Sequence, residues 1–271
     1  MMAMRIKGPA RWLAPLVFGV LLAGCVSPPI HVDNLSASLA GRESVSVSKL
    51  YGGDFELLAI EKAGNGSTIY LYLEGDGRPW VSGGSHVSDD PSPRRPYLLP
   101  IMLDSPGPAL YLGRPCYFGL GPKRHCHPTL WTFSRYSDRV IMAMVEAAEQ
   151  WLATYHEESM VTLVGHSGGG VLALLMAERL PQVNRVIAMA TPVSLSTWAQ
   201  QHDYFPLFDS LDPMTLQNWR SDVERHFLFG SDDRVVPPGR FAPLARTIPG
   251  SKVEIVRGQG HRCCTLHPRV D

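Results

Sequence analysis

The stretch Gly165-His166-Ser167-Gly168-Gly169 places a serine hydroxyl among glycines. It follows a short apolar run, residues 160–164, and opens a segment of helical character, residues 168–180. Glycines on both sides of a serine permit a turn that is too tight for residues with a Cβ atom. Such a turn projects the hydroxyl clear of the backbone, and the N–H of Gly168 at a helix start can bind an oxyanion. The pattern predicts that Ser167 is a nucleophile.

A base for this serine is predicted in the last part of the chain. His261 follows the apolar run 252–256 and stands behind the turn Gly258-Gln-Gly. An imidazole titrates near neutral pH, so it can take a proton from a hydroxyl and return it at working pH. Its place after the last predicted strand distinguishes His261 from the nine other histidines.

The predicted acid lies between these two residues in the sequence. The run 225–229 leads into Gly230-Ser-Asp-Asp-Arg-Val-Val-Pro237, which carries Asp233 three residues after the glycine. A carboxylate here could bond the imidazole and hold its tautomer. Asp232 is the neighbouring alternative, and a polar turn is the simpler reading of both aspartates.

A serine, an aspartate and a histidine in this chain order, each placed after a strand, resemble the α/β-hydrolase superfamily. The resemblance extends from about Phe55 to His261. It implies a serine hydrolase with Ser167 as nucleophile, Asp233 as acid and His261 as base, acting on a small-molecule acyl substrate. It implies no cofactor and no metal.

The loop after the first buried strand, Leu73-Glu-Gly-Asp-Gly-Arg-Pro-Trp80, departs from the family pattern. Many members have His-Gly where this chain has Glu74-Gly75. The resemblance makes Asp76 the second backbone donor of the oxyanion hole, beside Gly168. A carboxylate facing the hole would repel the negative charge that develops there. We therefore expect the Asp76 side chain to bond locally, within the turn from Gly75 to Gly77.

Three further motifs accompany this loop: Arg114-Pro-Cys116, Trp131-Thr and Arg135-Tyr-Ser137. In combination with it they look like a group of bacterial α/β-hydrolases, and this resemblance indicates no substrate. Aromatic side chains are expected to line a pocket or to pack in the core. They are Trp80, Tyr117, Trp131 and Trp198.

Short apolar runs alternate with helical patterns along the chain. Ile141, Met144, Val145, Ala148, Trp151, Leu152 and Tyr155 form one apolar stripe, with Ser137 and Asp138 suited to the helix start. Buried strands are predicted at 68–73, 109–112, 160–164, 185–189, 225–229 and 252–256, with an antiparallel edge strand at 55–60. This order predicts an α/β fold, a mostly parallel central sheet with helices on both faces. Residues 193–220 are less regular and could form a small cap or lid.

The N-terminus has the features of an export signal. Arg5, Lys7 and Arg11 precede the apolar run 12–23, which is shorter than the roughly 20 residues that span a bilayer. Leu22-Ala-Gly-Cys25 resembles the lipobox of bacterial lipoproteins, which implies cleavage after residue 24 and a lipid on Cys25. An ordinary secretory signal is the alternative. We expect a signal peptide at 1–24, a Ser/Ala-rich tether at 25–50 and one domain at 51–271.

Export and a lipid would hold the protein at a membrane surface of the cell envelope. Val26 after the cysteine favours the periplasmic face of the outer membrane, by rules for enteric lipoproteins. Removing three basic residues with the signal leaves 22 basic residues against 25 acidic ones. No clustered basic face suggests a nucleic-acid partner.

Four further cysteines would lie in an oxidising compartment. Cys116 and Cys126 flank a turn-rich loop and could pair with each other. Adjacent cysteines such as Cys263 and Cys264 rarely pair, because disulfides suit a wider Cα separation. A zinc site from Cys116, His125, Cys126 and His127 is a weaker alternative, because the spacing is unusual.

Two rival interpretations remain beside an esterase that acts on soluble esters. The first is a catalytically silent envelope protein that keeps the fold as a scaffold or binding module. The second is a lipase, since a lipid anchor would raise the local concentration of bilayer substrates. The sequence contains no clear amphipathic lid in support of a lipase.

Overall fold

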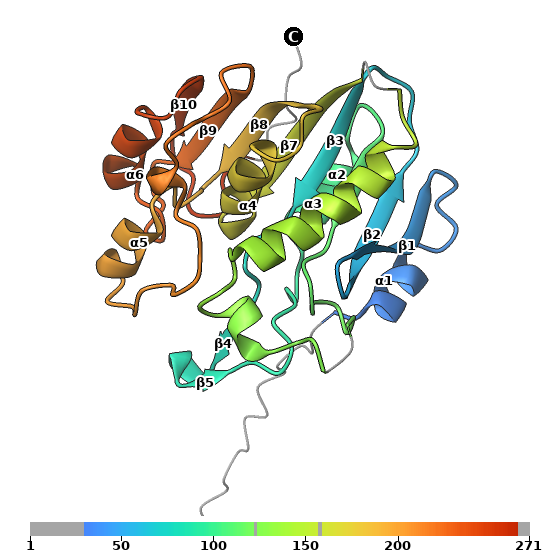
Figure 1. Cartoon of the computed structure of the whole chain (residues 1–271), viewed down its shortest axis with the longest axis horizontal. Helices are drawn as coiled ribbons and strands as arrows, with labels where there is room; N and C mark the ends of the chain where they lie inside the picture. The colour runs from blue at the N-terminus through green and yellow to red at the C-terminus, as the bar shows by residue number, and fades with distance from the viewer. Residues whose placement is uncertain (1–29, 122–123, 157–158, 265–271) are drawn as a thin grey trace, which may run out of the picture.

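An eight-stranded sheet forms the centre of the computed structural model, which describes residues 30–121, 124–156 and 159–264 (Figure 1). Its order is β1-β2-β6-β3-β7-β8-β9-β10. The strands are β1 (Val45–Gly52), β2 (Phe55–Lys62), β3 (Thr68–Leu73), β6 (Ala109–Leu112), β7 (Met160–His166), β8 (Val183–Met189), β9 (Glu224–Gly230) and β10 (Ser251–Val256). A small hairpin of β4 (Trp80–Val81) and β5 (His86–Val87) stands apart.

Six α-helices and three 3₁₀ turns connect the strands of the described chain. They are α1 (Val32–Leu39), α2 (Leu98–Leu103), α3 (Asp138–Leu152), α4 (Gly168–Ala177), α5 (Leu195–Gln201), α6 (Pro238–Ala245), η1 (Ser82–Gly84), η2 (Pro128–Trp131) and η3 (Pro213–Thr215). α3 and α4 cross the face of the sheet that is nearer the viewer in Figure 1. The chain steps in the opposite direction from β3 to β6, so a right-handed crossover puts α2 on the other face.

The strands from β6 to β10 in the sheet order are all parallel, and β1 and β2 join them as antiparallel neighbours. This arrangement confirms the predicted α/β class with a mostly parallel sheet. β3 and β7, at the centre, are buried along nearly their whole length. α4 is buried at every position, which explains why its sequence is apolar all round rather than striped. The junction between β7 and α4 therefore lies within the core.

Residues 30–50 are more ordered than the expected tether. α1 buries Leu35 and Leu39 on one side, and β1 pairs with β2 along its full length. The Ser-rich composition hides two periodic patterns, an i/i+4 leucine pair and an alternation around Val45 and Val47. The prediction of a tether to residue 50 is wrong for this part.

The strand predicted at 55–60 is antiparallel, as expected, but it is not an edge. β2 pairs with β1 on one side and with β6 on the other. β1 forms the edge instead. Its last residue, Gly52, lies so close to α3 that a Cβ atom would stand 1.8 Å from the carbonyl oxygen of Ala143.

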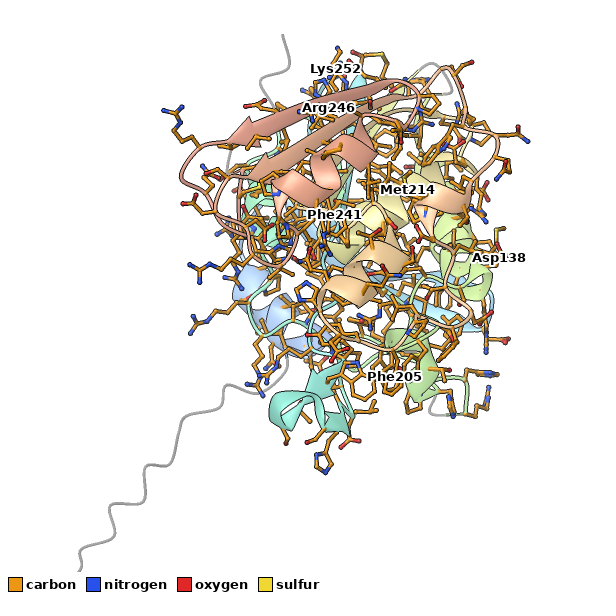
Figure 2. All side chains as sticks on the ribbon, turned by 90° about the vertical axis from the view of Figure 1, so that its left-hand side faces the viewer. Asp138, Phe205, Met214, Phe241, Arg246 and Lys252 are labelled. Atoms are coloured by element: carbon orange, nitrogen blue, oxygen red, sulfur yellow. A yellow bond between two sulfur atoms is a disulfide. The ribbon has the colours of Figure 1, made fainter. Side chains whose placement is uncertain are left out.

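Residues 193–220 form one wall beside the carboxyl end of the sheet. They contain α5, η3 and connecting loops, and Phe205 is 77% exposed. Figure 2 shows Phe205 low on this side of the molecule, below Phe241 of α6. The irregular character expected for this segment is therefore observed.

Both cysteine pairs are bonded. Cys116 and Cys126 are joined with their Cα atoms 5.6 Å apart, the pairing considered for the sequence. Cys263 and Cys264 are also joined, at a Cα separation of 3.7 Å, so the expectation against this pair is wrong. Cys264 has a φ of 73°, a left-handed conformation that turns the chain sharply at this point. With their sulfurs bonded to each other, Cys116 and Cys126 are not free to bind zinc.

The predicted signal peptide and Cys25 lie outside the described residues. Within residues 30–121, 124–156 and 159–264, no helix has the length and apolar character needed to cross a membrane. The same residues contain no group of three or more His, Cys, Asp or Glu side chains arranged to hold a metal ion.

Candidate functional site

Ser167 stands alone between β7 and α4, at the carboxyl edge of the sheet. Its φ of 53° and ψ of −121° are sparsely populated for a residue with a side chain. The neighbouring glycines make this turn possible. A Cβ atom on Gly165 would lie 2.3 Å from the carbonyl oxygen of Gly169, and one on Gly169 would lie 1.9 Å from that of Leu73. The Ser167 N–H is held by the carbonyl of Met189 at 2.8 Å.

His261 returns to this serine from the loop after β10. Its Nε2 lies 3.0 Å from Ser167 Oγ, and its Nδ1 lies 2.9 Å from Asp233 Oδ2. The three side chains therefore form one hydrogen-bonded series in the expected order. The second oxygen of Asp233 accepts the N–H groups of Val235 and Val236, at 2.8 and 2.9 Å.

Asp233 is 3% exposed, whereas Asp232 beside it faces solvent and accepts a hydrogen bond from the Ser231 hydroxyl. Burial acts to raise the pKa of Asp233. The hydrogen bonds from His261 and from the Val235 and Val236 amides outweigh burial, so this pKa is lowered. Asp233 thus carries a negative charge behind the imidazole over the neutral pH range. Geometry selects Asp233, not Asp232, as the partner of His261.

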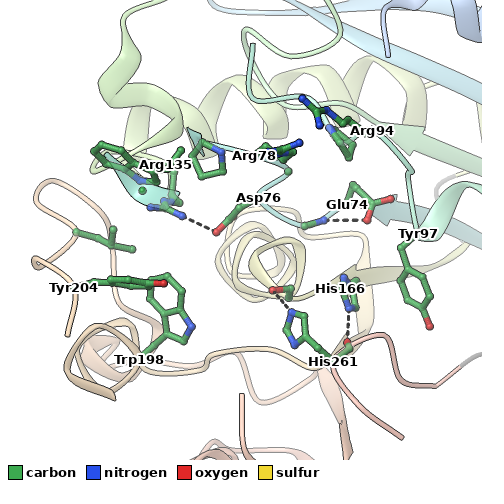
Figure 3. Close-up of a pocket in the computed structure, with 18 of the residues that line it drawn as sticks. Glu74, Asp76, Arg78, Arg94, Tyr97, Arg135, His166, Trp198, Tyr204 and His261 are labelled. Atoms are coloured by element: carbon green, nitrogen blue, oxygen red, sulfur yellow. Dashed lines mark hydrogen bonds and ion pairs between the residues drawn. The ribbon is translucent and has the colours of Figure 1, made fainter. Parts of the chain in front are cut away.

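His166, next to the serine, is hydrogen-bonded to the loop that carries His261. Its Nε2 donates to the backbone carbonyl of His261 at 2.8 Å, which fixes its tautomer, because a carbonyl can only accept. Its ring packs against those of Tyr97 and His261 (Figure 3). Sequence reasoning used His166 only as part of a motif and missed this contact, since nothing in the spacing reveals a partner 95 residues away.

The oxyanion donors predicted from sequence lie together. Gly168 adjoins Asp76 so closely that a Cβ atom there would stand 1.9 Å from Asp76 Oδ1. Neither backbone N–H, of Asp76 or of Gly168, has an acceptor among the described residues. These two free N–H groups lie beside the Ser167 hydroxyl and have the chemistry to bind an oxyanion.

The Asp76 side chain does not bond within its own turn, and that expectation is wrong. Arg114 pairs with Oδ1 at 2.8 Å, Arg135 pairs with Oδ2 at 2.9 Å, and the Tyr136 hydroxyl donates to both oxygens at 2.7 and 2.8 Å. Tyr117 also donates to the Asp76 backbone carbonyl at 2.9 Å. These partners come from the Arg114 and Arg135 motifs of the sequence, so the separate motifs meet at one carboxylate.

This cluster, Asp76 with Arg114, Arg135 and Tyr136, carries more positive than negative charge. Burial acts to raise the pKa of Asp76, but the two guanidinium charges and the Tyr136 hydrogen bond lower it to about 2. One carboxylate between two arginines leaves a formal charge of +1 next to the free N–H groups. The cluster would therefore stabilise an oxyanion rather than repel it.

Glu74 supports the same loop from the other side. Its carboxylate accepts the N–H of Leu98, at the start of α2, at 2.9 Å and the hydroxyl of Tyr111 at 3.3 Å. Burial raises its pKa, against the opposing effect of these hydrogen bonds. Glu74 thus links the end of β3 to α2 and does not face the serine with a free charge.

A cavity of about 1160 Å³ opens over Ser167 and His261. Of the four aromatic residues named from sequence, Trp80 and Trp198 line it. Tyr117 and Trp131 do not, because they are buried in the walls, where Trp131 donates to the Ser88 carbonyl at 3.0 Å. Phe133, Tyr204 and Phe205 complete an aromatic side of the cavity.

Comparisons with known proteins agree with this architecture. A family described as a PGAP1-like alpha/beta domain matches residues 136–233, a segment that includes Ser167 and Asp233 but stops short of His261. No curated protein sequence matches significantly.

Several solved structures share the fold at low identity. A Pyrococcus furiosus esterase matches with a TM-score of 0.57 at 13% identity, over 80% of this chain and 83% of its own. A serine hydrolase without a lid from Xanthomonas campestris matches with a TM-score of 0.52 at 11% identity, over 81% of this chain and 87% of its own. An esterase/lipase from an uncultured bacterium has a TM-score of 0.51 at 16% identity, over 87% of this chain and 84% of its own. The chain therefore has the fold of these α/β serine hydrolases and esterases, in agreement with the resemblance seen in the sequence.

Substitution Asp76→Asn tests the charge cluster. The side chains of Arg114 and Arg135 are each 5% exposed, and Arg114 Nε and Nη1 already lack partners. Removing the carboxylate would leave two buried guanidinium charges uncompensated. We expect a loss of about 3–5 kcal/mol in the free energy of unfolding, measured by urea denaturation. Asp222→Asn, which breaks an exposed pair with Arg220, is the control and should change little. Equal urea midpoints for Asp76→Asn and wild type would contradict this role.

Substitution His166→Gln tests the buried imidazole. Burial is the main cause that lowers the pKa of His166 from 6.5 to about 4. Between pH 6.5 and about 4, this histidine is protonated in the unfolded chain but neutral in the folded chain. The free energy of unfolding therefore falls as the pH drops from 6.5 toward 4. This group accounts for up to about 3 kcal/mol of that loss. Glutamine keeps an N–H donor but cannot titrate, so its unfolding free energy should fall less steeply over the same window. Parallel pH profiles for the two proteins would refute the assignment.

Proposed function

We propose that the protein is a serine hydrolase that cleaves a carboxylic ester, or a related acyl bond, through an acyl-enzyme on Ser167. The observation that carries the proposal is the uninterrupted hydrogen-bonded series from Ser167 through His261 to Asp233. A scaffold protein would have no need to hold a serine in a strained conformation against an imidazole and a buried carboxylate.

In the proposed reaction His261 Nε2 removes the Ser167 proton as Oγ attacks the substrate carbonyl carbon. The carbonyl oxygen becomes an oxyanion and is bound by the N–H groups of Gly168 and Asp76. His261 then gives its proton to the leaving alcohol, and the ester bond breaks. A water molecule, deprotonated by His261, attacks the acyl-enzyme in the same way and releases the acid and free Ser167.

Asp233 and the Asp76 cluster have separate parts in this scheme. Asp233 keeps Nδ1 of His261 protonated and stabilises the imidazolium that forms on each proton transfer. The net positive charge around Asp76 adds a favourable field at the oxyanion. Esters are proposed first, and thioesters or amides second.

Labelling by a fluorophosphonate tests the proposed nucleophile. The wild-type chain without its signal should react with the probe and hydrolyse short p-nitrophenyl esters, whereas Ser167→Ala should do neither. Asp233→Asn should lower kcat by about 10,000-fold, because the imidazole loses its oriented tautomer, while Asp232→Asn serves as the matched control and should retain activity. Unchanged labelling in Ser167→Ala, or none in the wild type, would favour the silent scaffold.

We further propose that Cys25 carries a lipid and holds the domain at the periplasmic face of the outer membrane. The supporting observation is the Leu22-Ala-Gly-Cys25 sequence behind a short basic and apolar segment. α1 begins at Val32, so a lipid on Cys25 would hold the folded domain close to the membrane surface.

Metabolic labelling with an alkyne analogue of palmitate tests the anchor. The full-length chain should take up the label and sediment with membranes, because acyl chains partition into the bilayer. Cys25→Ser should lose the label and move to the soluble fraction, while Ser27→Ala should behave as wild type. A labelled Cys25→Ser variant would refute lipidation at this residue.

A further inference from the structure

Four arginine side chains surround the cavity over Ser167 without a carboxylate partner among the described residues: Arg78, Arg94, Arg95 and Arg262. They come from three separate segments. Arg78 lies in the loop after β3, Arg94 and Arg95 precede α2, and Arg262 follows His261. The fold thus brings like charges from distant parts of the sequence to one opening.

These arginines differ from those that hold the structure together. Arg114 and Arg135 are buried against Asp76, whereas Arg78 and Arg94 are half-buried and Arg95 and Arg262 are exposed. None of the four has a side-chain hydrogen bond within the described chain, so their donors are free. Like charges gathered at a concave surface raise the local concentration of anions and favour an anionic ligand.

The remaining carboxylates of the cavity do not cancel this charge. Asp76 is already neutralised by two arginines, and Glu74 is occupied by hydrogen bonds from Leu98 and Tyr111. Asp203 is exposed and adjoins Tyr204, on the aromatic side. The arginine side therefore presents a net positive surface.

The aromatic side lies apart from the arginines. In Figure 3, Trp198 and Tyr204 lie below Arg135 on one side of His261, while Arg78 and Arg94 lie beyond Asp76 and Glu74. Trp80 and Phe133 pack edge to face, with ring centres 5.8 Å apart, and extend this apolar wall. Ser167 lines the same cavity as the aromatic residues and the four arginines.

We propose that the substrate is an anionic ester, with an apolar acyl chain on the aromatic side and a phosphate or carboxylate on its alcohol part, bound by Arg78, Arg94, Arg95 and Arg262. The inference rests on the proposed acyl-transfer function. A guanidinium offers forked N–H donors that match either oxyanion, and the aromatic side removes the acyl chain from water. The ester carbonyl between the two ends then faces Ser167.

Three esters with the same acyl chain test the proposal: octanoylglycerol 3-phosphate, the octanoyl ester of glyceric acid and 1-octanoylglycerol. Each is used below its micelle concentration, and release of octanoate is measured. We expect kcat/KM for at least one anionic ester to exceed that of the neutral ester tenfold or more. A preference for both anionic esters over the neutral ester identifies a site that accepts either anion. A preference for only one of them shows whether the site is selective for a phosphate or for a carboxylate. Raising NaCl to about 0.5 M should reduce the preference, because salt screens exposed charges.

The double variant Arg78→Gln/Arg94→Gln should bring the ratio of anionic to neutral kcat/KM at least fivefold closer to one. Arg246→Gln is the matched control, since Arg246 is an exposed arginine at the end of α6, remote from the cavity (Figure 2), and it should keep the wild-type ratio. Urea midpoints establish that each variant is folded. A wild-type ratio near one, or a ratio unchanged in the folded double variant, would overturn the proposal.

Binding without turnover separates this inference from the proposed function. Calorimetry on Ser167→Ala should give a Kd for octanoylglycerol 3-phosphate, or for the glycerate ester, at least tenfold below that for 1-octanoylglycerol. If the wild type hydrolyses none of the three esters but this selectivity is found, the anion subsite stands and the hydrolase proposal falls. If all three are hydrolysed and bound equally, the hydrolase proposal stands and the subsite is refuted.

Discussion

The carboxylate of Asp76, which lies between the buried side chains of Arg114 and Arg135 and accepts the Tyr136 hydroxyl, fixes the relative positions of three segments around the serine. The loop after β3 carries Asp76, the Cys116–Cys126 loop follows Arg114, and the turn before α3 carries Arg135 and Tyr136. The cluster also lies directly against Gly168, at the first turn of α4. Any displacement of one segment would break a charged hydrogen bond in a site with little access to water, which is costly. The positions of the two free backbone N–H groups, of Asp76 and Gly168, are therefore set by this cluster.

A second contact closes the site from the opposite side. His166 belongs to the end of β7, and its ring N–H holds the backbone of His261. Ser167 is thereby fixed to the residue that would activate it, because neighbouring residues on one turn bind the side chain and the backbone of the same histidine. Asp233, anchored by the amides of Val235 and Val236, holds the far side of the ring. The imidazole is restrained at both nitrogens and at its own main chain, which limits the reorganisation needed for proton transfer.

Local patterns in the sequence were enough for the parallel sheet and for the order of Ser167, Asp233 and His261 along it. Continuous apolar runs mark strands buried on both faces, and glycines mark the turn that cannot hold a Cβ atom. Contacts that depend on distant partners were missed. Asp76 was expected to bond in its own turn, because no local signal shows that Arg114 and Arg135 converge on it. Cys263 and Cys264 were not expected to pair with each other, because disulfides usually join Cα atoms that lie farther apart, while the observed pair includes Cys264 in a left-handed conformation. The helix and strand within residues 30–50 were missed, because the high serine content indicated a tether and the apolar periodicity is weak.

Holding a loop with an ion cluster costs free energy, because the charged groups must be removed from water. Apolar residues of similar volume often give equal or greater stability. The location of this cluster gives a reason for it. Apolar packing at residue 76 would position the backbone equally well but would leave the nearby N–H groups in a neutral surrounding. With Asp76 paired to two arginines, the same atoms that fix the loop contribute a formal charge of +1 beside those N–H groups. The side chains of both arginines are 5% exposed, so water screens this charge less than it screens the charge of an exposed arginine. Exposed arginines could not replace it, because water and salt would screen their charge and their side chains would have to be ordered first. The Glu74-Gly75 sequence, which stands where many α/β-hydrolases have His-Gly, is therefore compatible with an oxyanion site, because Asp76 in the same loop is paired with both arginines.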